Sequence, residues 1–181
     1  MVHPDRITFQ ARMAGDERPV AIKAYDTEEA RDAEVARFLR LQGLQAVPRL
    51  VRERLELVWS EAEETRVHAL VLAWVGAEDE GGERFGGGRA AALPPPALVQ
   101  VREALVRMHR LGVAHRDVRE DNLVWDASGR RAYVLDLSHA VTEGDAGAEG
   151  FAGLCQEDLS SVDRLLAAAR ARDASAARMV R

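Results

Sequence analysis

A long segment poor in large apolar side chains, residues 76–96, interrupts the sequence near its middle. It consists largely of Gly, Glu, Ala and Pro and includes Gly86-Gly87-Gly88 and Pro94-Pro95-Pro96. Because such a composition leaves little to bury, we interpret the segment as a linker. The chain of 181 residues is therefore expected to fold in two parts, residues 1–75 and 97–181, which together suffice for one compact unit with two lobes.

The part before the linker contains four strand-like patterns. Residues 6–13 and 19–25 predict two strands, and the second of them ends close to Lys23. Residues 50–59 and 67–75 are apolar runs on either side of a polar connection, so they predict a pair of strands. We expect these four segments to form a small antiparallel sheet.

Helical periodicity occurs in three places. The first helix is expected to begin after an N-cap at Asp26 or Thr27 and to end at Gly43. A second is predicted by apolar residues at helical spacing between Leu98 and Met108. A third is expected over residues 156–171, in an Ala/Leu-rich stretch near the end of the chain.

Two short apolar runs after the second helix predict a β-hairpin. Residues 122–125 and 132–135 flank Asp126-Ala127-Ser128-Gly129, which is rich in turn-forming residues. A Gly/Glu-rich stretch, residues 143–153, then separates the hairpin from the last helix. The predicted fold class is α+β, with a small sheet and one helix before the linker and a mainly helical part after it.

Charge and cysteine content exclude several functional classes. The formal net charge of −5 argues against a general nucleic-acid-binding surface, because neutralising phosphates requires clustered Lys and Arg. Cys155 is the only cysteine, so neither an intramolecular disulfide nor a Cys/His metal cluster is expected. No apolar run approaches the ~20 residues of a membrane span, and the N-terminus lacks the pattern of a signal peptide. We expect an intracellular protein, cytoplasmic or nuclear.

Three motifs carry polar residues suited to phosphate chemistry. His115-Arg116-Asp117 is followed five residues later by Asn122, and Asp136-Leu137-Ser138 follows the predicted hairpin. Upstream, Val20-Ala21-Ile22-Lys23 ends a predicted strand. Together they resemble the catalytic loop, the metal-binding motif and the lysine-bearing strand of protein kinases. The resemblance covers roughly residues 19–166 and implies a bilobal kinase-like fold with a reduced helical lobe.

The resemblance implies a role for each polar residue, with ATP and Mg²⁺, or Mn²⁺ in its place, as cofactors. Lys23 would hold the α- and β-phosphates and pair with Glu34. Asn122 and Asp136 would hold the metal ion, whose preferred ligands are such oxygens. Asp117 would orient or deprotonate the acceptor hydroxyl.

The resemblance also implies a nucleotide pocket and a supporting framework. Ala21 and Val124 would sandwich the adenine, Leu72 would be the gatekeeper, and Ala73, Trp74 and Val75 would form the hinge. Phe38, His115 and Leu137 would stack in the internal hydrophobic spine that couples the lobes. Asp158 would anchor the backbone of the catalytic loop.

The sequence departs from the kinase pattern at three points. No glycine-rich loop precedes Lys23, Leu137-Ser138 replaces Phe-Gly, and the short distance from Asp136 to Asp158 leaves no room for an Ala-Pro-Glu motif. Minimal kinases, such as the small atypical kinases of tRNA-modification complexes, are similar in this respect. A protein partner that covers the reduced lobe is therefore expected.

Three functions fit these residues. The first is an atypical kinase that transfers the γ-phosphate of ATP to a protein Ser/Thr hydroxyl or to itself. The second is a pseudokinase that binds nucleotide or a partner without turnover, and the third is a small-molecule phosphotransferase. Retention of every charged catalytic residue favours the first function.

Overall fold

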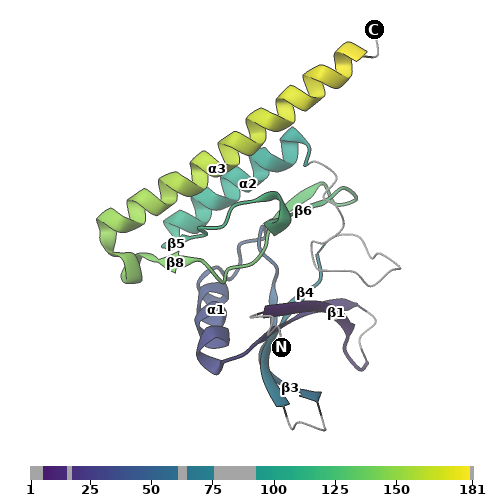
Figure 1. Ribbon diagram of the computed structural model, residues 1–181, viewed down its shortest axis with the longest axis vertical. Helices are drawn as coiled ribbons and strands as arrows, with labels where there is room; N and C mark the ends of the chain where they lie inside the picture. Colours follow the sequence, from purple (N-terminus) through teal and green to yellow (C-terminus); the bar gives the residue numbers. More distant parts are fainter. Residues whose placement is uncertain (1–5, 16–17, 61–64, 76–92, 180–181) are drawn as a thin grey trace.

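Four strands in the first part of the chain form one antiparallel sheet in the order β1-β2-β4-β3 (Figure 1). The computed structural model describes residues 6–15, 18–60, 65–75 and 93–179. The strands are β1 (Arg6–Arg12), β2 (Pro19–Tyr25), β3 (Leu50–Ser60) and β4 (Thr65–Ala73). The sequence patterns predicted all four strands, and the α+β class is confirmed.

Helix α1 (Glu28–Arg40) packs against one face of this sheet. Thr27 is its N-cap, and the Thr27 hydroxyl accepts a hydrogen bond of 3.2 Å from the amide of Ala30. Two carboxylates in the first turn suit the positive end of the helix dipole. The helix buries Arg31, Glu34, Val35 and Phe38, so two of its charged side chains are buried, and Glu34 is the one that points to the site.

The second part begins with helix α2 (Pro95–Arg110), in which proline occupies the first turn, where its missing N–H costs least. The end of the predicted linker is thus helical, whereas residues 76–92 lie outside the described residues. After α2 come β5 (Val113–Ala114), a 3₁₀ turn η1 (Glu120–Asn122), β6 (Leu123–Asp126), β7 (Arg131–Val134) and β8 (Val141–Thr142). Strands β6 and β7 form the expected hairpin, and β5 pairs with β8.

The tight turn of the hairpin is built around Asp126. Its Oδ1 accepts hydrogen bonds of 3.0 Å from the amides of both Ser128 and Gly129. This side-chain mimic of a backbone turn explains why the Asp-Ala-Ser-Gly sequence reverses the chain here.

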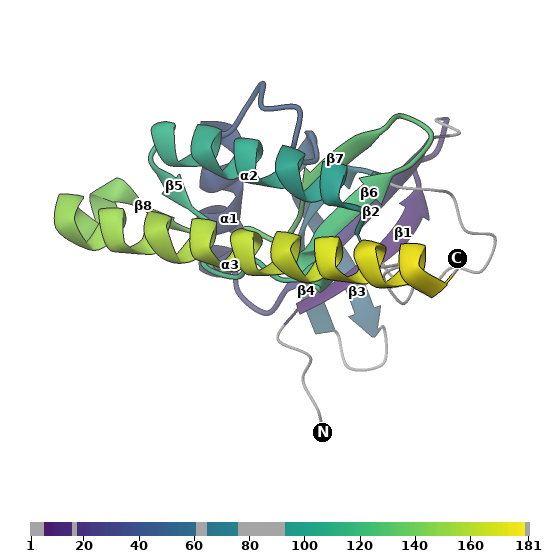
Figure 2. The same ribbon diagram turned by 90° about the horizontal axis from the view of Figure 1, so that it is seen from above.

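Helix α3 (Glu143–Met179) corrects the sequence prediction, which began the last helix at residue 156. The span consists of two helices joined at a kink, where Gly147 has a non-helical φ of 69°, so helical structure covers most of the Gly/Glu-rich stretch. Phe151 is buried and lies at helical spacing before Val162 and Leu166, on the same apolar face. Its burial stabilises the helical turns that precede residue 156. Helices α2 and α3 lie side by side (Figure 2).

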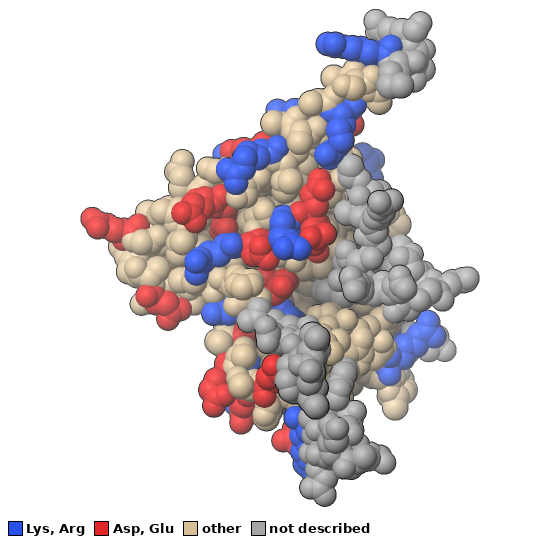
Figure 3. Space-filling view, viewed as in Figure 1, with Lys and Arg blue, Asp and Glu red and all other residues tan. Residues whose placement is uncertain are grey.

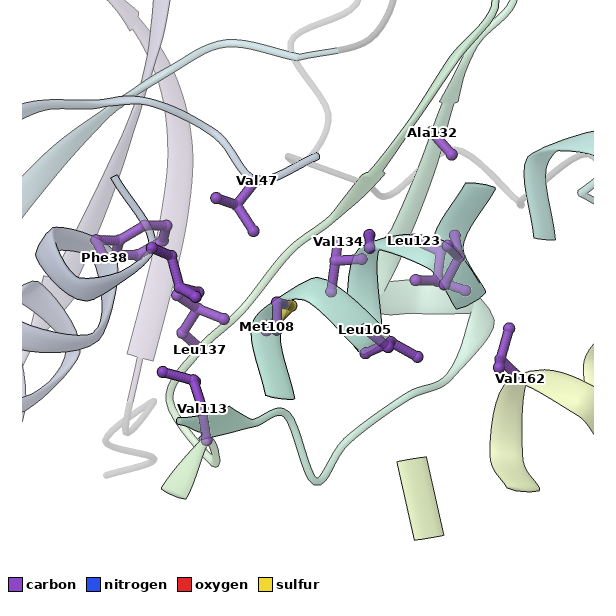
Figure 4. Packing of buried hydrophobic residues seen from close by; sticks show 14 of the residues in the cluster. Phe38, Val47, Leu105, Met108, Val113, Leu123, Ala132, Val134, Leu137 and Val162 are labelled. Carbon is purple, nitrogen blue, oxygen red and sulfur yellow. The ribbon is translucent and has the colours of Figure 1, made fainter. Parts of the chain in front are cut away.

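One hydrophobic cluster runs through both parts of the molecule. It joins Phe38 of α1 to Leu137 and then to Leu105 and Met108 of α2 (Figure 4). The backbone between α1 and β3 is fixed to both parts, since Ala46 O accepts from Val134 N at 2.8 Å. The two parts therefore share a core.

Acidic and basic side chains are interspersed over the face shown in Figure 3. Of the helices in the described ranges, none combines the length and the apolarity that a membrane crossing requires.

Candidate active site

Lys23 is buried with only 5 % of its surface exposed, and it lies between two carboxylates. Its Nζ donates to Glu34 Oε1 at 2.8 Å and Oε2 at 3.0 Å, and to Asp136 Oδ1 at 2.5 Å. Because Ala21, Lys23 and Tyr25 alternate along β2, this lysine points to the same face as the core residues that meet α1. A buried ammonium group is stable only with such partners.

Lys23 is also the only lysine of the chain, among 25 Lys and Arg residues in total. A compact ammonium can contact two carboxylates from opposite sides, whereas the planar guanidinium of arginine is larger and fixed in its geometry. Every other Lys or Arg position of the chain carries arginine, and lysine occurs only at position 23, where a small cation fits between two carboxylates.

Glu34 is completely buried and accepts four hydrogen bonds. Besides the two from Lys23, it accepts one of 2.8 Å from the Tyr25 hydroxyl and one of 3.1 Å from the amide of Leu137. The last of these bonds connects α1 directly to the backbone that follows Asp136. Glu34 therefore couples the position of α1 to the position of the Asp136-Leu137-Ser138 motif.

Arg37, one turn further along α1, completes this connection. Its Nη1 donates to the carbonyl oxygens of Leu137 at 3.0 Å and Ser138 at 2.9 Å. Glu34 thus accepts from the Leu137 amide while Arg37 satisfies the carbonyls. The backbone of the Asp-Leu-Ser motif is held to α1 on both sides.

Asp136 has a left-handed backbone with φ 58°, which turns its carboxylate toward Lys23. Burial would raise the pKa of this carboxyl, but the charge and hydrogen bond of Lys23 and the bonds from Ser138 outweigh it and hold the pKa well below its usual range. About a third of the side chain, 34 %, remains exposed. Asp136 is therefore a permanently charged group that can still receive a ligand.

The loop after β5 is fixed by a single buried carboxylate, Asp158 of α3. Its Oδ2 accepts from the amide of His115 at 2.7 Å, and its Oδ1 accepts from the amide of Arg116 at 2.8 Å. His109 of α2 lies 2.9 Å from the same Oδ2. The His115 ring in turn contacts the carbonyl of Leu135 at 2.8 Å, which ties the loop to the strand before Asp136.

Asp117 and Asn122 lie at the end of this fixed loop. The Asn122 Nδ2 donates to Asp117 Oδ2 at 2.7 Å and to the Asp117 carbonyl at 2.9 Å. Since both bonds use the amide nitrogen, they leave the amide oxygen of Asn122 as the group that can accept a metal ion.

A cavity of about 90 Å³ brings most of these groups together. It is lined by Thr8, Lys23, Glu34, Leu72, Asp121, Asn122, Leu135 and Asp136. An ammonium group, three carboxylates and an amide side chain thus line one small space. The oxygens of Asn122 and Asp136 fit a magnesium ion, which proteins commonly bind through one or two such side chains together with substrate phosphates.

The structure distributes the other predicted site residues over more than one place. Leu72 lines the cavity at Lys23 and lies opposite Ala21 in the β2–β4 register. Ala21 is fully buried and Val124 is half-buried in β6, and neither lines this cavity. Ala73, Trp74 and Val75 border a larger cavity on another side. Residues 1–5, where the resemblance to protein kinases would place a glycine-rich loop, contain no glycine and lie outside the described residues.

Four residues at the site were not predicted from the sequence. Thr8 faces Lys23 across the β1–β2 pair and enters the cavity, a placement that depends on strand register. Tyr25 lies two residues after Lys23, so the alternation of β2 could have identified it. Arg37 and Asp121 stand among many charged residues and carry no signal in the sequence.

Comparison with known proteins identifies the fold. No family model matches the chain, and no curated protein matches it. Among solved structures 1025 chains match, which indicates a widespread fold. One is the PK-1 kinase of Cydia pomonella granulovirus, with a TM-score of 0.55 and 16 % sequence identity. The match covers 75 % of this chain and 48 % of the viral kinase, so the chain spans about half the length of that protein. At this identity the likeness establishes a kinase-like fold.

Proposed function

We propose that this protein is an ATP-dependent phosphotransferase, an atypical minimal kinase that transfers the γ-phosphoryl group of ATP to a hydroxyl acceptor. The observation that carries the proposal is the placement of the only lysine. Lys23 is buried between Glu34 and Asp136 and opens onto a cavity that Asn122 also lines. A kinase-like fold with this constellation supplies the charges that phosphoryl transfer requires.

In the proposed reaction, Lys23 keeps its bond to Glu34 and turns its remaining donor capacity from Asp136 to the α- and β-phosphates. Glu34 fixes the direction of the ammonium group, and α1 fixes Glu34. The Lys23–Glu34 pair is prepared before the nucleotide arrives, so binding has to reorganise only the contact between Lys23 and Asp136.

Asn122 and Asp136 are the residues that would hold Mg²⁺, or Mn²⁺ in its place. The bound ion would neutralise the charge that develops on the phosphate oxygens. Asp136 is suited to this task because its pKa is held low, so it is ionised at every physiological pH. The bonds from Asn122 aim the carboxylate of Asp117.

Asp117 is the proposed acceptor-orienting group. Its carboxylate would accept the proton of the attacking hydroxyl as the new oxygen–phosphorus bond forms and ADP departs. One Oδ already accepts a hydrogen bond from Asn122, which leaves the other for the acceptor.

The adenine would lie between Ala21 and Val124, with Leu72 as the gatekeeper and the backbone of residues 73–75 as the hinge. The proximity of Leu72 to Lys23 in one cavity supports this placement. The proposed acceptor is a protein Ser/Thr hydroxyl, with autophosphorylation as the simplest case. A protein partner over the reduced helical part would supply the acceptor surface.

The test is turnover of radiolabelled ATP with Mg²⁺ by the wild-type protein, with casein and the protein itself as acceptors. We expect ³²P transfer that is lost in Lys23→Ala, Asp117→Ala and Asp136→Ala but retained in Asp163→Asn, an exposed control on α3. Nucleotide binding without transfer, unchanged by Asp117→Ala, would instead identify a pseudokinase. Transfer confined to small hydroxyl compounds would identify a small-molecule phosphotransferase.

A further inference from the structure

A second cavity, of about 350 Å³, is not lined by Lys23, and of its lining residues the proposed reaction uses only the backbone of the hinge, residues 73–75. It is bordered by the loop between α1 and β3, the end of β4 and strand β7. Its apolar wall includes Phe38, Leu41, Val47, Leu50 and Trp74. The volume is within the usual range of ligand-binding pockets, roughly 300–1,000 Å³.

A smaller cavity of about 210 Å³ continues this space along α2. The two cavities share Leu44, Gln45 and Arg131, so they adjoin each other. The smaller one reaches Glu103 and Arg107 of α2. We call the two together the rear groove, an elongated depression with an apolar end at Trp74 and a polar end at α2.

The walls of the rear groove are formed in advance. The loop between α1 and β3 is bonded to both neighbours, since Ala46 O accepts from Val134 N and Arg49 O accepts from Ala73 N, each at 2.8 Å. At the other end, the Gln100 amide accepts from Ala132 N at 3.0 Å and donates to Arg130 O at 3.1 Å. A ligand therefore does not have to order these segments when it binds.

The rim of the rear groove is cationic although the protein as a whole carries a net charge of −5. Arg49, Arg107 and Arg131 line it and are exposed, and Glu103 is the one carboxylate on its lining within the described ranges. Within the described residues, no side-chain hydrogen bond or ion pair within 4.0 Å involves these three guanidinium groups, although Asp126 lies opposite Arg131 in the hairpin and interacts with its charge. Arg49 and Arg107 therefore offer their donors to a ligand, and Arg131 shares its charge with Asp126.

We infer that the rear groove is a docking site for an acidic, extended segment of a partner protein, with one or two large apolar side chains as anchors. The apolar end accommodates the anchors against Phe38 and Trp74. The three guanidinium groups face carboxylates along the segment. The three arginines are distributed over two adjoining cavities. Because the groove is elongated, it fits an extended peptide better than a compact ligand.

The docking site connects to the proposed catalytic centre through Phe38. This side chain lines the larger cavity and also packs in the core beside Leu137, next to Asp136 (Figure 4). The inference does not depend on catalysis, because docking requires neither nucleotide nor metal.

The probe for docking is a set of fluorescein-labelled octapeptides, measured by fluorescence anisotropy at low salt. Six positions carry Asp or Glu, and the two central ones carry Leu, Phe or Trp. Two control sets replace the acidic residues by Lys or the central residues by Ser. We expect saturable binding of the acidic apolar set and at least about tenfold weaker binding of both control sets, since charge and anchor both contribute.

Charge reversal locates the bound peptide. The double variant Arg49→Glu/Arg131→Glu should weaken binding about tenfold or more, whereas Arg170→Glu, an exposed site on α3, should leave it unchanged. In ¹⁵N spectra the indole N–H of Trp74 should shift and that of Trp125 should not. Equal binding of the lysine peptides, insensitivity to the double variant, or equally tight binding of single N-acetylated amino acids would each overturn the inference.

Discussion

Replacement of Glu34 by glutamine tests the buried network that connects α1 to the Asp136-Leu137-Ser138 motif. The carboxylate of Glu34 accepts hydrogen bonds from Lys23, Tyr25 and the Leu137 amide. Glutamine has nearly the same size, but one of its two terminal groups can only donate. The variant therefore leaves the shape of the core intact while it removes a charge and at least one acceptor.

The expected loss of stability follows from these contacts. Breaking a buried ion pair by removing one partner costs about 3–5 kcal/mol, because the other charge stays buried. In Glu34→Gln, Asp136 still faces Lys23 at 2.5 Å and offsets part of that cost. We therefore expect the free energy of unfolding to fall by about 2–4 kcal/mol, and by more in Glu34→Ala, which also removes the hydrogen bond between the Tyr25 hydroxyl and Glu34.

Urea denaturation followed by circular dichroism measures this change. The matched control is Glu157→Gln, an exposed glutamate within α3, which should shift the free energy of unfolding by less than about 0.5 kcal/mol. If Glu34→Gln behaves like that control, Glu34 does not hold the network together and the account of α1 as a fixed support is wrong.

Three further predictions concern the support of the site. Arg37→Ala removes the donors to the Leu137 and Ser138 carbonyls, so it should lower the free energy of unfolding by about 1–2 kcal/mol. It should also weaken magnesium-dependent nucleotide binding in calorimetry, and Arg37→Lys should recover part of both losses. Unchanged binding and stability in Arg37→Ala would contradict the role of Arg37 in holding this backbone to α1. The pKa of the Asp136 carboxyl is lower in the folded protein than its ordinary value of about 3.9. The ionised carboxylate therefore stabilises the fold at pH values above that ordinary pKa. This contribution is lost as the pH falls towards the lower pKa of the folded protein. The stability difference between wild type and Asp136→Asn should consequently shrink in urea titrations between about pH 6 and pH 3, and a difference that grows over this interval would refute the assigned charge. Asp158→Asn should speed hydrogen exchange at the amides of His115 and Arg116, whereas Asp163→Asn should not; equal exchange in the two variants would show that Asp158 does not anchor the loop.

Most of the helices and strands could be predicted from the sequence because the contacts that form them lie within a few residues of one another. Thr27 caps α1 through its own hydroxyl, and Asp126 organises the hairpin turn through its own carboxylate. The sequence motifs also predicted that Lys23 and Asp136 belong to one site, and the structure brings these two side chains together with Glu34. Their roles in catalysis stay predictions.

Features that depend on distant contacts could not be predicted in the same way. Glycines in residues 143–153 favoured a loop, but Phe151 is buried, and its packing outweighs the poor helix propensity of its neighbours. Arg37 has no distinguishing sequence context, and its bonds join residues about a hundred positions apart. The rear groove is assembled from segments on both sides of the linker, so no single stretch of sequence indicates it.

Modification of the only lysine tests the central claim most directly. A biotinylated acyl phosphate of ATP acylates amines at the site where the nucleotide binds, and mass spectrometry can assign the label to Lys23, with the N-terminal amine as an internal reference. We expect Lys23 to be labelled in a magnesium-dependent way, excess ATP to protect it, and Asp136→Asn to abolish both effects. Labelling of Lys23 that equals the N-terminal amine and ignores excess MgATP would contradict a nucleotide site at this lysine.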